Sequence, residues 1–191
     1  MSFLLREIED ETFLNQNFSL AGDIADAYYR CTFEACNFQD LDLDKVLFED
    51  CTFKNCNLSL VKLLGGKMSF CRFEDSKILA VNWSQLEHAR ELSFARCILD
   101  GSIFHSMNLP YIKFSESSLK DVDLSAAQLK ESDFSSCDLK GAIFEGCDLR
   151  KADFRNARSY AISPVDNRLS KAKFSNPEVL SLLSFFDIEI Y

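Results

Sequence analysis

The sequence predicts an all-β fold: a solenoid of four-sided coils that covers nearly the whole chain and is followed by a short helix. Three observations support this prediction. Apolar residues recur every five positions, most clearly from Ser132 to Asn156, and neither the 3.6-residue period of a helix nor the two-residue period of a strand produces that spacing. In that stretch a small residue stands two positions before each apolar centre. Every fourth centre, finally, is a phenylalanine.

This longer period of four centres defines one coil. Its members are Phe13, Phe33, Phe53, Phe73, Phe94, Phe114, Phe134, Phe154 and Phe174. If four five-residue units form the four sides of one coil, residues 20 apart lie directly above one another, at about the 4.8 Å spacing of hydrogen-bonded strands. We therefore expect these nine phenylalanines to stack as a ladder along one side of the solenoid.

The repeat changes phase once. Phe73 and Phe94 are one position further apart than the other neighbours in the series, and the extra residue falls in the segment SQLEHARELS, residues 84–93. We expect this residue to loop out without interrupting the stack. A second column, which contains Met68 and Leu109, is expected to skip Ala89 at the same place.

The repeat region is predicted to span residues 1–175, and a C-terminal helix and tail to span residues 176–191. Asn176 is suited to cap a helix whose first position is Pro177. The segment that follows is more apolar than one short helix can bury against a single coil. Some of this apolar surface should therefore face a partner.

Composition and charge argue against several classes of function. The 191 residues are 47% hydrophobic, which fits one domain with a buried core, and the net charge is -9. Direct nucleic-acid binding needs a basic surface and is not expected. No apolar run approaches the roughly 20 residues of a membrane span. The acidic start MSFLLREIEDE lacks the features of a secretion signal, so a cytoplasmic location is expected.

All eight cysteines occupy the small inward position of a repeat: Cys31, Cys36, Cys51, Cys56, Cys71, Cys97, Cys137 and Cys147. Free cysteine in such a position serves as a small buried hydrophobe, and a reducing cytosol opposes disulfides. A metal site is the less favoured alternative. It would need Cys31, Cys36, Cys51 and Cys56 to converge on one ion at about 2.3 Å.

No catalytic residue, cofactor site or metal site is predicted. Of the two histidines, His88 falls in the phase-break segment and His105 at an outward position, and neither has an implied pocket. The carboxylates of the clearest repeats are interpreted as a solvated outer face: Asp133, Asp138, Asp148 and Asp153. A closed solenoid with a filled axis offers no natural cleft, so the protein is predicted to be a non-enzyme that acts through its surface.

The unit small-Asp/Asn-Leu/Phe-x-x, which is repeated from about Phe13 to Phe174, resembles that of the pentapeptide repeat proteins. This resemblance implies a right-handed quadrilateral β-helix. The stretches CTFEACNF, ELSFARCILDGSIF and AKFSNPEVLSLLSFFDIEI are further similar to the subgroup that protects DNA gyrase and topoisomerase IV. Within it, the albicidin-resistance proteins are most similar, followed by the microcin-immunity and Qnr quinolone-resistance proteins. The resemblance implies an acidic rod that imitates duplex DNA and binds gyrase or topoisomerase IV.

The subgroup also implies a homodimer whose solenoids meet end to end at their C-termini. The residues expected at this interface are Val179, Leu180, Leu182, Leu183, Phe185, Phe186, Ile188 and Ile190. The short 84–93 segment is the only insertion. A protection mechanism that depends on long projecting loops, as in some Qnr proteins, is therefore not supported.

Mimicry of DNA must be local. About eight coils make a rod of roughly 40 Å, and a duplex of that length carries about 24 charges, well above the net charge of -9. Residues 1–60 contain 12 acids and 4 bases, whereas residues 61–115 contain 5 and 7 and residues 116–191 contain 13 and 10. The candidate partner surface comprises Glu34, Asp40, Asp42, Asp44, Glu49, Asp50, Glu74 and Asp75.

Two other functions remain open at this point. The same rod could be a structural or adaptor scaffold that docks an unrelated partner, its acidic face serving only solubility. It could also sequester an antibiotic directly. The sequence does not decide which compound is countered, or which topoisomerase is bound.

Overall fold

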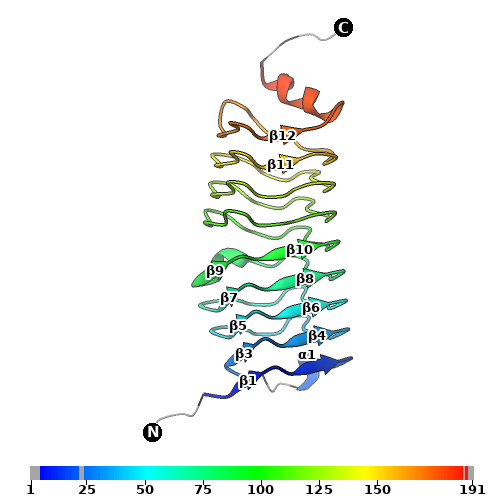
Figure 1. Cartoon of the computed structure of the whole chain (residues 1–191), viewed down its shortest axis with the longest axis vertical. Coiled ribbons are helices and arrows are strands. Elements are labelled where there is room, and N and C mark those ends of the chain that lie inside the picture. Colours follow the sequence, from blue (N-terminus) through cyan, green and yellow to red (C-terminus); the bar gives the residue numbers. More distant parts are fainter. Residues whose placement is uncertain (1–4, 22–23, 187, 189–191) are drawn as a thin grey trace.

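The computed structural model describes residues 5–21, 24–186 and 188. It is a parallel β-solenoid of about eight turns, in which the coils stack from the N-terminal end to a helix at the C-terminal end (Figure 1). The predicted fold class is therefore confirmed. Each coil has four sides, which we number 1 to 4 in chain order. Each strand pairs in parallel with the strand on the same side of the next coil, as Glu7 pairs with Ala27 and Arg72 with Ser93.

Sides 1 and 2 carry the regular strands. Side 1 is formed by β1 (Glu7–Glu9), β3 (Ala27–Tyr29), β5 (Leu47–Glu49), β7 (Lys67–Ser69) and β9 (His88–Arg90). Side 2 is formed by β2 (Thr12–Leu14), β4 (Thr32–Glu34), β6 (Thr52–Lys54), β8 (Arg72–Glu74) and β10 (Ser93–Ala95), and near the C-terminal end by β11 (Asp153–Phe154) and β12 (Lys173–Phe174). Sides 3 and 4, and the later coils, are held by isolated parallel bridges such as Asn37↔Asn57 and Asp42↔Lys62. The helices are α1 (Phe18–Ala21), η1 (Trp83–Gln85) and η2 (Glu178–Phe186).

The corners explain why five residues make one side. The residue two positions after most centres turns the chain with a positive φ, for example 57° at Asp40 and 52° at Asp50. Asp and Asn tolerate this left-handed conformation better than most residues, and they occupy many of the corners. The corner N–H donates to the coil above, as Asp40 does to the carbonyl of Ser59 at 2.9 Å. Each turn is thereby tied to the next.

The phenylalanine ladder fills the axis behind side 2. The rings of Phe33 and Phe53 stack with centroids 4.8 Å apart and planes 11° apart, and the same geometry joins Phe53 to Phe73. The seven inner members are fully buried, while Phe13 and Phe174 at the two ends are partly buried. The eight cysteines are also buried and none forms a disulfide.

The extra residue of the phase break forms a one-residue β-bulge on side 1. The Glu87 N–H donates to the Gly66 carbonyl at 2.9 Å, at the usual spacing, but the strand partner of Lys67 is His88, one residue later. Glu87 and His88 thus both lie opposite Lys67, which is the arrangement of a β-bulge. The column does not skip Ala89, as the sequence suggested: Ala89 lies opposite Met68 in register. The expectation was wrong because it required a large side chain at every centre.

The C-terminal coil is irregular between residues 157 and 169, although Arg158 and Arg168 keep parallel bridges to the coil below. The chain then enters η2, a 3₁₀ helix that begins at Glu178 rather than at Pro177. Its first turn is closed by the Leu180 N–H, which donates to the Pro177 carbonyl at 3.0 Å. Of the expected dimer residues, Ile190 lies outside the described part of the chain.

Candidate interaction surface

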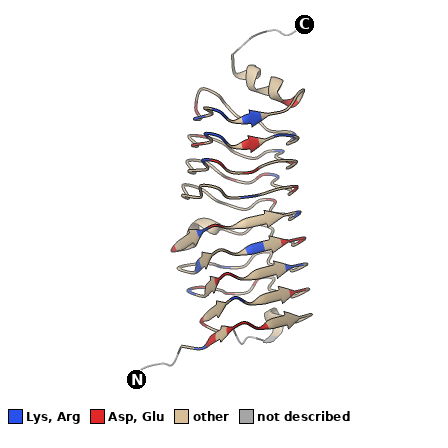
Figure 2. Ribbon diagram, viewed as in Figure 1, with Lys and Arg blue, Asp and Glu red and all other residues tan. Residues whose placement is uncertain are grey.

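The net charge is concentrated at one end of the rod. Residues 1–50 hold 12 of the 30 acidic residues and 3 of the 21 basic ones, which accounts for the whole net charge of -9. The rest of the chain contains equal numbers of the two signs. Figure 2 shows acidic segments around the lowest coils and mixed charges above them. A basic partner therefore meets its strongest complement at the N-terminal coils.

The eight predicted acids do not share one face. Glu34 and Glu74 lie on side 2, in β4 and β8, and Glu49 lies on side 1, in β5. Asp42 and Asp44 flank the side 4 centre Leu43. The three remaining acids, Asp40, Asp50 and Asp75, occupy positive-φ corners. The acids thus surround the rod, because successive five-residue units turn to successive sides.

Three of the eight acids are neutralised within the molecule. Asp50 pairs with Arg72 at 3.1 Å, and Glu74 with Lys54 at 3.8 Å. Asp75 receives two hydrogen bonds from the Arg96 guanidinium of the next coil, at 2.7 and 2.8 Å. This guanidinium holds the pKa of Asp75 below its ordinary value. These pairs are exposed and each contributes little stability, but they lower the charge available to a partner.

Asp40, Asp42 and Asp44 are the strongest part of the predicted surface. Among the described residues none of the three is in an ion pair. The Asp42 carboxylate accepts the Asp44 N–H at 3.0 Å, and the Asp44 carboxylate accepts the Leu64 N–H from the coil above at 2.8 Å. These bonds fix both carboxylates on side 4 without neutralising them. The three acids thus form a patch at side 4 and its corner that makes no ion pair among the described residues, and backbone bonds fix two of its carboxylates.

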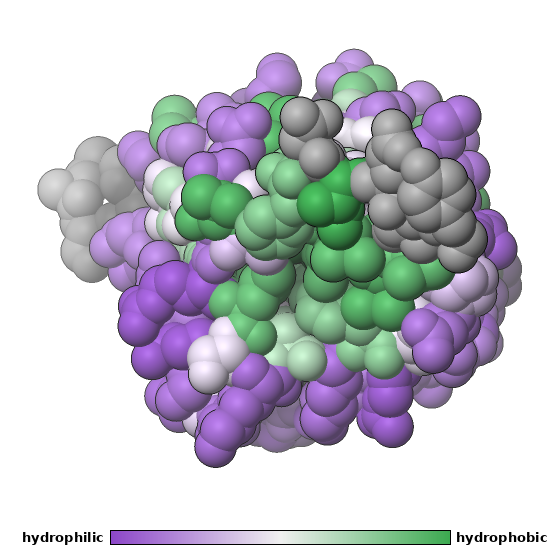
Figure 3. All heavy atoms as spheres, turned by 90° about the horizontal axis from the view of Figure 1, so that it is seen from above, coloured by the Kyte–Doolittle hydropathy of each residue, from purple (hydrophilic) through white to green (hydrophobic). Residues whose placement is uncertain are grey.

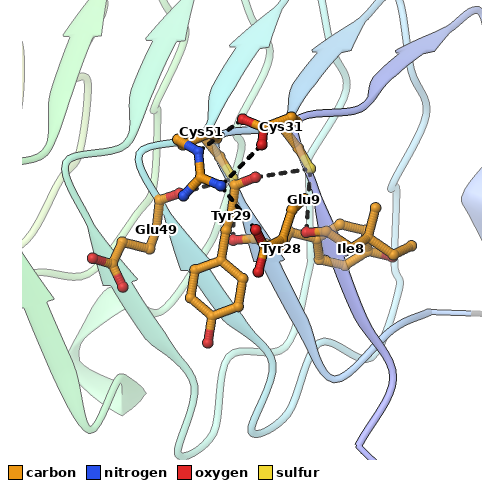
Figure 4. Close-up of polar contacts among 9 residues, drawn as sticks. Ile8, Glu9, Tyr28, Tyr29, Cys31, Glu49 and Cys51 are labelled. Carbon is orange, nitrogen blue, oxygen red and sulfur yellow. Dashed lines mark hydrogen bonds and ion pairs between the residues drawn. The ribbon is translucent and has the colours of Figure 1, made fainter.

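The structure adds an acidic column that the sequence prediction did not include. On side 1, Glu9, Tyr29 and Glu49 stand in register on three successive coils. Figure 4 shows Tyr29 and Glu49 extending from neighbouring strands. The same view shows the Cys31 thiol, which lies within hydrogen-bond distance of the Ile8 and Tyr29 carbonyls. Partial burial raises the pKa of Tyr29, and the carboxylates of Glu7, Glu49 and Glu9 add to the effect. The signal was present in the sequence, where Glu9 and Glu49 hold the same repeat position two coils apart.

The expected solvated face of Asp133, Asp138, Asp148 and Asp153 is different in the structure. Asp148 is buried, with its side chain only 5% exposed, and Asp153 and Asp138 are 15% and 14% exposed. Arginines cover them. Arg150 makes two bonds to the Asp148 carboxylate, at 2.8 and 2.6 Å, and these arginine bonds hold the pKa of Asp148 below its ordinary value. This end is a structural network of ion pairs.

The C-terminal end presents an apolar surface. Seen from that end, hydrophobic side chains gather at the centre of the face with hydrophilic ones around them (Figure 3). Leu180, Phe185, Phe186 and Ile188 are between 42% and 53% exposed. Val179, Leu182 and Leu183 are partly buried. Such a patch at the end of a rod is typical of an interaction site.

The described residues offer little for catalysis. Within residues 5–21, 24–186 and 188, no group of three or more His, Cys, Asp or Glu side chains could hold a metal ion. Burial raises the pKa of the Cys51 and Cys56 thiols to about 12, so thiolate is scarce at neutral pH. In the part of the chain that the structure describes, no helix is long and apolar enough to cross a membrane.

The fold and surface define a class of protein: a closed β-solenoid that presents charged and apolar surfaces. Two family profiles identify the family. "Pentapeptide repeats (8 copies)" matches residues 29–65, and "Pentapeptide repeat region" matches residues 88–154. Together they cover just over half of the chain. The chain is therefore a pentapeptide repeat protein, of a family whose members are generally non-catalytic scaffolds.

Several solved structures share the fold. A trypsin-treated form of QnrB1, a plasmid-mediated fluoroquinolone resistance protein, has a TM-score of 0.76 at 16% identity and covers 100% of this chain and 93% of that one. Full-length QnrB1 has a TM-score of 0.64 at 12% identity, with 95% and 100% covered. No curated protein sequence gave a significant match. At these identities the likeness shows the fold, and the closer resemblance to albicidin-resistance or microcin-immunity proteins stays a prediction.

Proposed function

We propose that this protein is a non-enzymatic partner of DNA gyrase, topoisomerase IV or both, and that it protects the enzyme from a poisoning antibiotic or toxin by local DNA mimicry. The observation that carries the proposal is the end-to-end match of the whole rod to a fluoroquinolone resistance protein, with a TM-score of 0.76. The sequence motifs of the topoisomerase-protecting subgroup and the acidic N-terminal coils support it.

The acidic coils would meet the basic DNA-binding surface of the topoisomerase. Duplex DNA is bound mainly through its phosphates, so a protein with fixed surface carboxylates can compete for the same cations. Asp40, Asp42 and Asp44 fit this role because backbone bonds hold two of their carboxylates in place. Glu49, which is in no ion pair among the described residues, extends the negative surface on side 1, whereas Arg30 neutralises Glu9 at 2.8 Å.

The experiment that tests the proposal is a gyrase supercoiling assay with a cleavage-stabilising poison, with and without the protein. We expect supercoiling to recover as the protein is added, and double-strand breaks to decrease. Binding should weaken as salt rises, because exposed charges are screened beyond about 8–10 Å. Neither protection nor inhibition at micromolar protein, with gyrase and with topoisomerase IV, would refute it.

The surface is tested by charge reversal. A triple variant, Asp40→Lys, Asp42→Lys and Asp44→Lys, should lose protection while keeping its circular dichroism spectrum. A matched control, Glu116→Lys, Asp121→Lys and Glu145→Lys, changes the net charge by the same amount at three acids in the charge-balanced half. If both variants protect equally, the N-terminal acids are not the contact surface.

We also propose a homodimer that joins two rods through η2. The exposed Leu180, Phe185 and Phe186 support this arrangement, because a second copy is a ready complement to an apolar end face. The adaptor alternative predicts binding to an unrelated partner and no effect on topoisomerases. The sequestration alternative predicts that the antibiotic binds in calorimetry without any topoisomerase present.

A further inference from the structure

A transverse notch crosses the corner between sides 1 and 2, directly after the β-bulge. On side 2 it contains the row Arg72, Ser93 and Lys113, which pair in register on three successive coils. The middle residue is small and the outer two are long cations. The backbone of the middle coil therefore forms the floor of the notch, and the long side chains of the coils on either side form its walls.

The corner itself supplies a second row, Phe70, Glu91 and Tyr111. All three adopt the left-handed corner conformation, with φ of 57° at Phe70 and 65° at Tyr111. This conformation is unfavourable for bulky side chains. Tyr111 is also 57% exposed, so its ring adds little to the core. The same conformation recurs at most corners of this fold, so the exposure of Tyr111, rather than its backbone, is what points to a role beyond core packing.

The two rows together line a surface hollow of about 440 Å³. Each wall offers an aromatic ring at the corner and a cation two residues later: Phe70 with Arg72, and Tyr111 with Lys113. The wall strands are two rungs apart, about 10 Å at the β spacing. A flat ring sandwiched between two others needs about 7–8 Å from ring to ring. The notch is therefore wide enough for one planar group once the Arg90 guanidinium, which lies over the Phe70 ring, and the Glu91 side chain of the middle coil turn aside.

The charges are unequal along the notch. At the aromatic end, Arg90 neutralises Glu91 at 3.2 Å, and its guanidinium lies 5.2 Å from the centre of the Phe70 ring. At the other end, Arg72 pairs with Asp50 at 3.1 Å. Lys113 is in no ion pair among the described residues. An anionic group is therefore favoured beside Lys113 and Ser93.

We propose that this notch binds a planar aromatic carboxylate, with its ring between Phe70 and Tyr111 and its carboxylate between Arg72 and Lys113. The Ser93 hydroxyl is placed to donate a further hydrogen bond to that carboxylate. No chemical step is involved. The site is on the outside of the solenoid and is independent of the acidic patch of Asp40, Asp42 and Asp44.

The test uses 2-naphthoate and the full-length protein in ¹H–¹⁵N NMR spectra. Peaks of residues 70–72, 91–93 and 111–113 should shift, with a dissociation constant of about 1 mM or tighter. Naphthalene-2-methanol lacks the charge, cyclohexanecarboxylate lacks the aromatic ring, and both should bind several-fold more weakly. If 2-naphthoate leaves these peaks unmoved at about 10 mM, the site does not exist.

Variants separate the two ends of the notch. Lys113→Gln should weaken 2-naphthoate binding by about 2- to 5-fold, whereas Lys62→Gln on side 4 should leave it unchanged. Tyr111→Asn should weaken it by about 2- to 10-fold, and asparagine suits the corner conformation, so the fold is kept. Glu91→Gln should strengthen binding, because it removes the nearest negative charge. Binding that is unchanged in Lys113→Gln and in Glu91→Gln would overturn the charge assignment.

Discussion

The rings of Phe73 and Phe94 stack with centroids 4.8 Å apart and planes 10° apart, although the coil between them is one residue longer than a regular coil. The stack is as close as that of Phe53 and Phe73, which belong to a regular coil. The bulge at Glu87 and His88 therefore absorbs the extra residue before the chain reaches side 2. The stacking of the phenylalanine rings in the core is therefore unaffected by the extra residue.

Deletion of Glu87 tests this insensitivity. The deletion restores a coil of regular length, and the Lys67–Glu87 ion pair that it removes is exposed, so the melting temperature should change by only a few degrees. Deletion of Phe94 is the control, because it removes a ring of the ladder and shifts every later centre. Unfolding of the Glu87 deletion would show that the bulge is required by the fold.

Asp148 should make stability depend on acid pH. Its bonds to Arg150 and the nearby Arg168, at 3.4 Å, favour the charged carboxylate, so its pKa is lower in the folded protein than in the unfolded chain. The stabilisation is complete above the unfolded pKa of about 3.9 and is lost as pH falls through the folded value.

Urea unfolding between pH 2 and 7 measures the effect of Asp148. Asp148→Asn should cost about 1.5–3 kcal/mol at pH 7, because two charge-assisted bonds are lost, and should flatten the acid decline. Asp121→Asn, an exposed corner residue in no ion pair among the described residues, is the comparison variant. An acid decline that is equally steep in both variants would contradict the assignment.

The cysteines should be inert in the folded protein. All eight are buried, and burial raises the pKa of the Cys97 and Cys147 thiols to about 11. At pH 8 we expect no carbamidomethylation by iodoacetamide over hours, and modification of every cysteine once denaturant is added. Mass spectrometry counts the modified thiols. Rapid labelling of Cys31 or Cys36 without denaturant would show that the first coils open locally.

The C-terminal interface is tested by adding charge. Leu180→Glu with Phe186→Glu should turn a dimer into a monomer in sedimentation velocity, because two apolar contacts per protomer are replaced by buried or repelling carboxylates. Leu64→Glu on side 4 is the control, since Leu64 is 57% exposed and shortly precedes β7, which lies several coils away from the C-terminal helix (Figure 1). A mass that is unchanged by the double variant would exclude this interface.

The four-sided coil could be predicted because the same packing requirement, an apolar residue at each centre, recurs in every coil. Each centre must contact the matching centres of the coils before and after it, so the nine phenylalanines specify the ladder more strongly than any local propensity. The position of the bulge was not predictable in this way. An extra residue fits several places within residues 84–93, and a single hydrogen bond, from Glu87 to Gly66, decides between them.

The candidate surface was only partly predictable. The acidity of the first coils follows from charge counts, and the five-residue spacing shows that Asp40 and Asp50 turn to different corners. The ion pairs could not be predicted from the sequence. The Asp75–Arg96 contact, for example, depends on the side-chain conformations of two residues on adjacent coils. The burial of Asp148 was missed for the same reason. Phe70 and Tyr111 left a readable signal, since both aromatics fall at corner positions.

The concentration of negative charge in the N-terminal coils makes the rod an electric dipole. Near a positively charged surface such a rod is turned before contact, so its N-terminal end arrives first. Two rods joined at their neutral C-terminal ends would have opposed dipoles that cancel, leaving a molecule that is negative at both tips. A dimer of this kind would approach with either tip, which doubles its productive orientations, and could span two basic sites at once.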